Sequence, residues 1–159
     1  MLNEVEVPSD ETDWKAAIRR TALSCHDVFL RHPWACSLMM RVNRPILARM
    51  QWMDSVLRIL REAGFSPDLT HHAYHALDSH ITGFTLWQVS LPFETREELV
   101  DMAEDFLREF PVADYPYVLE HIQQHLVESG AGERSAFEFG LDLILDGLER
   151  ARDAPDEAH

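Results

Sequence analysis

Histidines at helical spacing are the residues of this sequence best suited to chemistry. His71 and His75 lie four residues apart, as do His121 and His125. On a helix, this spacing puts two imidazole rings on one face, where they could hold a transition metal. No cysteine or carboxylate completes either set, and the segment HIQQH differs from the HExxH motif of metalloproteases at Ile122. Solvated histidines fit the pattern better, so we expect no metal or other cofactor, with His71 and His75 as weak metal candidates.

Patterns typical of enzymes are missing from the sequence. It contains no GxSxG nucleophile elbow, no phosphate-binding Walker loop and no GxGxxG dinucleotide motif. Cys25 and His26 are adjacent, but neighbouring residues of a helix do not face each other. Asp142 and Asp146 have the spacing of a solvated helix face. We therefore expect no catalytic residues and no enzyme activity.

Charge and composition restrict the partners. The chain has 159 residues, the length of one domain, and a formal net charge of −14. Phosphate backbones repel so acidic a chain, which predicts no direct DNA contact. The two cysteines form no CxxC pair, and neither a signal peptide nor a long apolar run is present. These features predict reduced thiols, a cytoplasmic location and no membrane contact.

Apolar periodicity predicts an all-α domain of six to seven helices, because apolar residues recur every three or four positions and no strand-like alternation occurs. Residues 1–9 are expected to be a lead-in, residues 10–153 the helical domain and residues 154–159 a disordered tail. The predicted helices cover residues 10–32, 34–40, 43–64, 66–90, 95–111, 116–130 and 133–153.

Local signals fix several helix ends. Ser66 precedes Pro67 and Asp68, the order of an N-cap, a first-turn proline and a favourable acid. Thr95 and Glu98 have the spacing of a capping box. Gly64 suits the left-handed residue that ends a helix.

Glycines inside predicted helices indicate close approach of a second helix, because each costs about 1 kcal/mol relative to alanine. The second helix could belong to a partner or to the same subunit. The wide apolar face of residues 133–153 has room for a core on one side and a partner on the other. The residues that we expect at a dimer interface are Gly83, Phe137, Gly140, Leu141, Ile144, Gly147 and Leu148.

Four segments, in order, carry a resemblance to a known family: DW…RRTALSCHDVFLRHPW, LREAGFSP, AYHALDSHITGF and FEFGLDLILDGLE. Over residues 10–152 the chain resembles the C-terminal domain of TetR-type transcriptional repressors, in particular the tetracycline repressor subgroup. The resemblance implies a homodimer in which the helices at 66–90 and 133–153 pack against their copies in a four-helix bundle. It also implies a small effector that controls negative regulation of transcription.

In that family a separate N-terminal helix-turn-helix domain binds DNA, and this sequence contains no counterpart. Met1 is compatible with an internal start, a truncation or a native start. Two alternatives stay open beside the repressor interpretation. One is a stand-alone dimerisation module that pairs with an intact relative, and the other is a helical binder of a small molecule or metal unrelated to transcription.

The resemblance also points to ligand-binding positions. Methionine and aromatic side chains in the central helices fit either a core or an adaptable apolar pocket. The family's metal-binding histidine and glutamate are replaced by Met39 and Trp87, which predicts an apolar or aromatic effector rather than magnesium–tetracycline. The candidate ligand-binding residues are Thr21, Cys25, Phe29, Met39, Trp52, Met53, Val56, Tyr74, Ser79, Phe84 and Trp87.

Overall fold

The computed structural model describes residues 4–6, 13–34, 47–92, 95–111, 114–128 and 135–154. Within these ranges it contains six helices and no strand, which confirms the predicted all-α class. Most of the short helix predicted over 34–40 lies outside the described residues. The helices are α1 (Trp14–Arg31), α3 (Leu47–Glu62), α4 (Pro67–Val89), α5 (Arg96–Glu109), α6 (Pro116–Glu128) and α7 (Ala136–Asp153).

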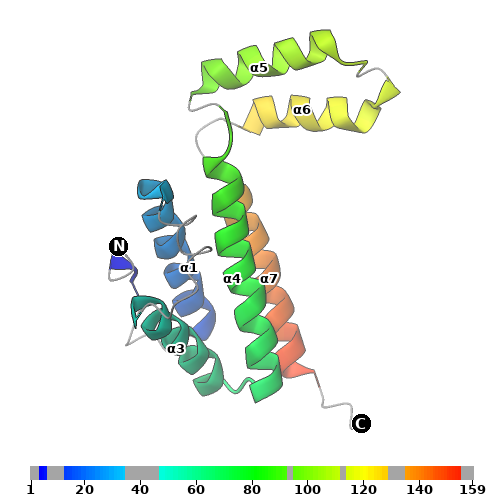
Figure 1. Ribbon diagram of the computed structural model, residues 1–159. Coiled ribbons are helices and arrows are strands. Elements are labelled where there is room, and N and C mark those ends of the chain that lie inside the picture. Colours follow the sequence, from blue (N-terminus) through cyan, green and yellow to red (C-terminus); the bar gives the residue numbers. More distant parts are fainter. Residues whose placement is uncertain are drawn as a thin grey trace. The chain divides into compact units, whose positions relative to one another are not determined.

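The chain divides into two compact units. Met1–Val89 and Ser135–His159 form the first unit, and Ser90–Arg134 form the second. In the first unit, α4 and α7 run side by side in opposite directions (Figure 1). Helix α1 packs against α3, α4 and α7, and α3 also packs against α4. Segments far apart in the sequence therefore meet around one core.

The helix ends follow the capping signals, with two differences. Gly64 has a φ of +90°, and the Ser66 hydroxyl accepts a hydrogen bond from the Leu69 amide at 3.1 Å. The capping box of Thr95 and Glu98 is present, as predicted. Two helices begin three or four residues later than the sequence suggested, because Asp13 caps α1 and Ser135 caps α7. Ser135 forms a second capping box with Glu138, which the sequence predictions did not include.

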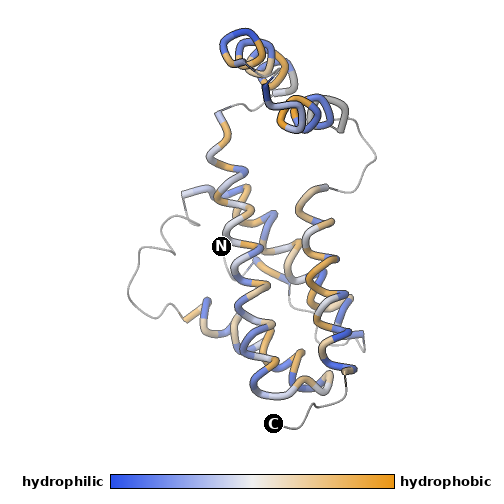
Figure 2. Tube along the Cα trace, turned by 90° about the vertical axis from the view of Figure 1, so that its right-hand side faces the viewer, coloured by the Kyte–Doolittle hydropathy of each residue, from blue (hydrophilic) through white to orange (hydrophobic). Residues whose placement is uncertain are grey.

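The core of the first unit contains residues from all four helices described there. Figure 2 shows apolar and polar residues interspersed along the helices, as expected for amphipathic elements. Val28 of α1, Leu60 of α3, Ala73 of α4 and Leu141 of α7 are all fully buried. Phe65, in the turn between α3 and α4, packs against the ring of Trp14 with 4.9 Å between centroids. This shared core fixes the relative positions of the four helices.

Helices α5 and α6 pack against each other in the second unit. Leu99 and Ala103 of α5 are buried, and the rings of Phe106 and Phe110 stack with centroids 4.4 Å apart. Tyr117 of α6 is 83% exposed. Across the described parts of both units, no helix has the length and apolar character needed to cross a bilayer.

Candidate ligand-binding site

A small cavity lies among α1, α3 and α4. Its walls are apolar or aromatic apart from one charged pair and a threonine. The space open to the centre of a water molecule is about 10 Å³, which is room for about one water. An aromatic molecule can therefore enter only if the surrounding side chains move. The lining residues are Cys25, Phe29, Arg49, Trp52, Asp78, Ile81 and Thr82.

The charged pair in the wall joins α3 to α4. An Arg49 guanidinium nitrogen lies 3.3 Å from a carboxylate oxygen of Asp78, and both side chains are partly buried. Burial raises the pKa of Asp78, while the charges of Arg49 and His75 act in the opposite direction. The pKa stays above its ordinary value, so the ion pair does not fully offset the loss of water around this carboxylate.

Two buried hydrogen-bond donors beside the charged pair lack an acceptor among the described residues. They are the indole Nε1 of Trp52 and the hydroxyl oxygen of Tyr74. Trp52 is 7% exposed and Tyr74 is 4% exposed, and their rings lie 5.9 Å apart. Burial and the charge of Asp78 raise the pKa of Tyr74, while the charge of Arg49 and a side-chain hydrogen bond from it act in the opposite direction. The hydroxyl is therefore close enough for both charged side chains of the cavity wall to influence its pKa.

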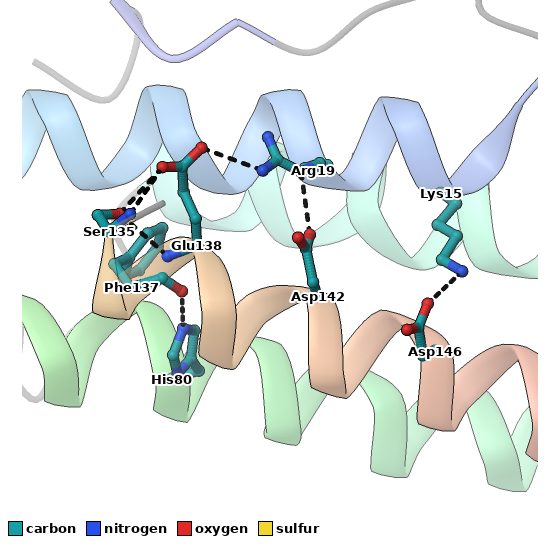
Figure 3. A network of polar contacts seen from close by, with 8 residues as sticks. All are labelled: Lys15, Arg19, His80, Ser135, Phe137, Glu138, Asp142 and Asp146. Atoms are coloured by element: carbon teal, nitrogen blue, oxygen red, sulfur yellow. Dashed lines mark hydrogen bonds and ion pairs between the residues drawn. The ribbon is translucent and has the colours of Figure 1, made fainter. Parts of the chain in front are cut away.

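Polar groups on the opposite side of the unit are paired. Figure 3 shows Arg19 of α1 reaching two acids of α7, with 3.0 Å to Glu138 and 3.0 Å to Asp142. Lys15 of α1 lies 2.5 Å from Asp146, which is one turn beyond Asp142 on α7. These pairs are partly exposed and run along the line where α1 meets α7.

A stack of three rings continues this contact between α1, α4 and α7. Phe137 lies between His26 and His80, with centroid distances of 3.9 and 4.9 Å. The Thr85 hydroxyl donates its proton to the Ile81 carbonyl, so it can only accept from Nδ1 of His26, 2.8 Å away. Burial lowers the pKa of His26. The structure thus favours a neutral His26 that carries its proton on Nδ1.

The sequence profile of one family matches nearly the whole chain. The profile is described as "Tetracyclin repressor-like, C-terminal domain", and it matches residues 7–152. The chain belongs to this family. This confirms the resemblance noted from the four sequence segments.

Relatives of this C-terminal domain are transcriptional regulators. The chain is 30% identical to the "HTH-type transcriptional repressor DrrR1" of Streptomyces coeruleorubidus, over 94% of this chain and 58% of that protein. It is 29% identical to the "Tetracycline repressor protein class C" of Escherichia coli, over 91% of this chain and 63% of that protein. The chain thus spans about three fifths of the length of these two relatives.

Solved structures share the fold of this C-terminal domain. One is ActR from Streptomyces coelicolor in complex with (S)-DNPA, with a TM-score of 0.72 and 22% identity, covering 95% of this chain and 71% of that chain. Apo ActR gives a TM-score of 0.71 with 23% identity, over 95% and 69%. The all-helical fold of the family is therefore confirmed.

The predicted ligand-binding residues of this domain fall into several places. Cys25, Phe29 and Trp52 line the cavity, and Tyr74 packs against Trp52. Val56 is buried in the core around these residues. The sequence predictions did not include Arg49, Asp78, Ile81 or Thr82, although each lies one helical turn or less from a residue that they did include.

The other described candidates are not among the residues that line this cavity. Thr21 is buried and donates to the Ala17 carbonyl of its own helix, and Met53 packs against the edge of the core. Ser79 is exposed. Phe84 contacts the ring of Trp87, which is 47% exposed. Met39 lies outside the described residues.

The predicted dimer residues are divided between the core and the surface. Phe137 and Leu141 are buried within the chain, and so is one face of Gly140, where a Cβ atom would lie 2.6 Å from Cε1 of His80. The close approach at Gly140 is thus made by α4 of the same chain. Gly83 is exposed and has open space around its Cα atom, whereas Ile144, Gly147 and Leu148 are partly buried.

The weak metal candidates are neighbours on the surface of α4. The rings of His71 and His75 lie 4.6 Å apart between centroids, and both residues are exposed. Among the side chains that the structure describes, no group of three or more potential ligands comes together. His121 is exposed, and the side chain of His125 lies outside the described residues.

Proposed function

We propose that this chain is the effector-binding and dimerisation domain of a TetR-family regulator that acts negatively on transcription. The observation that carries the proposal is the cavity among α1, α3 and α4, which combines apolar and aromatic walls with a few polar groups. Named relatives are repressors, and ActR has been solved with a small molecule bound. We expect no enzyme activity, a cytoplasmic location, and DNA binding through a helix-turn-helix domain supplied outside this sequence.

The proposed effector is a small apolar or aromatic molecule. Cys25, Phe29, Trp52 and Ile81 supply apolar surface, which gains free energy when a ligand displaces water from it. Tyr74 and Val56 lie directly behind this wall, and we include them among the residues that move to admit the ligand. Because the resting cavity holds about one water, binding requires the side chains around it to move apart.

A planar aromatic probe tests the ligand site. We expect 9-fluorenone to bind wild-type protein with one site per chain in isothermal titration calorimetry. Thr82→Phe should abolish binding by filling the cavity, whereas His72→Phe, an exposed position on the same helix, should not. Circular dichroism checks that both variants remain helical. Equal binding by Thr82→Phe and wild type would place the ligand elsewhere and contradict the proposed site.

The proposed partner is a second copy of this chain, packed through α4 and α7. Phe139 and Leu143 form an exposed apolar strip on α7, each 56% exposed, and Gly83 and Trp87 form one on α4. The two helices pack side by side, so the strips can join into one surface. Exposed large apolar side chains on neighbouring helices are typical of an interface.

Analytical ultracentrifugation tests the dimer. Wild-type protein should sediment with twice the 18.4 kDa of the monomer. Phe139→Asp and Leu143→Asp should each yield monomers, because a dimer would bury an unpaired charge. Leu47→Asp, at a 73% exposed position of α3, should remain dimeric. A dimer that persists in both α7 variants would move the interface elsewhere.

A further inference from the structure

Two buried hydrogen-bond donors at the cavity indicate which polar group a ligand needs. The indole nitrogen of Trp52 can only donate a hydrogen bond, and the hydroxyl of Tyr74 can donate one. Neither has an acceptor within the part of the chain that the structure describes, because the Arg49 side chain beside the Tyr74 hydroxyl can only donate. Buried polar atoms in folded proteins are nearly always satisfied, so an exception invites an explanation. Because the two atoms belong to adjacent rings at one cavity, we look for one explanation that accounts for both.

The position of both atoms connects them with the cavity. Trp52 lines it, and the ring of Tyr74 lies 5.9 Å from the ring of Trp52. The Tyr74 hydroxyl is influenced by the charges of Arg49 and Asp78, both of which are lining residues. The third atom of this kind is the hydroxyl of Thr70, one turn before Tyr74 on α4. Neither residue lines the cavity, but Tyr74 packs against the lining residue Trp52 and is influenced by Arg49 and Asp78. The unused donors at the cavity are therefore Trp52 and Tyr74.

The charged pair in the cavity wall determines whether a charged or an uncharged ligand oxygen is favoured. Arg49 already faces Asp78 at 3.3 Å, so its positive charge is opposed. A ligand anion at this place would stand near the Asp78 carboxylate and repel it. An uncharged oxygen accepts hydrogen bonds without this repulsion. A carbonyl oxygen has two lone pairs and can accept from two donors at once.

We infer that the cavity selects aromatic ligands that carry an uncharged acceptor oxygen, to which the Trp52 indole and the Tyr74 hydroxyl donate. This inference rests on the proposed effector-binding function and names the ligand chemistry of the same site. Apolar walls alone discriminate weakly between similar molecules, whereas a site with buried donors rejects an analogue that leaves them unpaired. Trp52 and Tyr74 are thus specificity-determining residues.

Two probes of nearly identical shape test the inference by calorimetry. 9-Fluorenone carries one ketone on a planar three-ring skeleton, and fluorene is the same skeleton without the oxygen. Wild-type protein should bind fluorenone at least about tenfold more tightly than fluorene, the effect of one or two hydrogen bonds. Trp52→Phe and Tyr74→Phe should each lower fluorenone affinity roughly fivefold to tenfold and leave fluorene affinity within about twofold.

Tyr115→Phe is the matched control, because it removes a tyrosine hydroxyl at a 59% exposed position of the second unit. It should change neither affinity. Equal binding of the two probes to wild type would overturn the inference and leave the proposed function standing. A ketone preference that survives in both variants would also overturn it, because the donors would then lie elsewhere. Binding of neither probe would overturn the proposed function and the inference with it.

Discussion

The first unit has two sides that differ in whether their polar groups are paired. On the α7 side, Arg19 and Lys15 meet acids, and His26 meets Thr85. On the α3 side, Trp52 and Tyr74 are about as buried as His26, but their donors have no acceptor among the described residues. Both sides share one apolar core, so hydrophobic burial does not distinguish them. Satisfied polar groups hold helices in place, whereas unsatisfied donors beside a cavity are suited to receiving something from outside.

Removing one buried hydroxyl from each side should expose this difference most strongly. Thr85→Val leaves Nδ1 of His26 without its acceptor and should lower the free energy of unfolding by about 1–3 kcal/mol. Tyr74→Phe removes a hydroxyl whose proton has no acceptor and should change the free energy by less than about 0.5 kcal/mol. Urea denaturation followed by circular dichroism measures both. Equal losses would show that the two sides are alike.

Acidification should act on the α7 side through His26. Burial lowers the folded-state pKa of His26, so the unfolded chain takes up this proton first as the pH falls. The stabilising effect of the neutral ring is present above the unfolded pKa of about 6.5 and is lost as the pH falls below it. Between pH 7.5 and 5.5 the loss cannot exceed about 1.4 kcal/mol per pH unit for one group.

His26→Gln identifies the contribution of this ring. The variant should be less stable than wild type at pH 7.5, and its stability should depend less on pH over the same range. His72→Gln, an exposed position of α4, should keep the wild-type dependence. Urea midpoints across the pH series provide the measurement. If the urea midpoints of wild type and His26→Gln change in parallel with pH, the pH dependence of stability would belong to other groups.

The ion pairs between α1 and α7 should give the smallest effect. Arg19→Met breaks contacts with Glu138 and Asp142, both partly exposed, and should cost about 1 kcal/mol or less. The cost should shrink in 1 M salt, which screens exposed charges. Arg108→Met removes a more exposed pair with Asp105 and serves as the control, with a smaller effect. A loss above about 3 kcal/mol would mean that this contact behaves as a buried pair.

The amphipathic pattern determined most of the fold. Periodicity and capping residues predicted the helices because these signals act within one or two turns. Gly64 and the capping box of Thr95 and Glu98 are where the sequence places them. The starts of α1 and α7 were predicted too early, since helical periodicity does not distinguish the first turn from the residues that cap it.

The sequence by itself determined the all-α class, the order of helices and the family, because each depends on local patterns or on linear order. Tertiary structure alone decided which helices each apolar face packs against. It placed Gly140 against His80 of the same chain and brought Arg49 and Asp78 of different helices into one wall. It also left the donors of Trp52 and Tyr74 without an acceptor among the described residues. These outcomes depend on how helices distant in sequence pack together, and residue spacing along one helix does not contain that information.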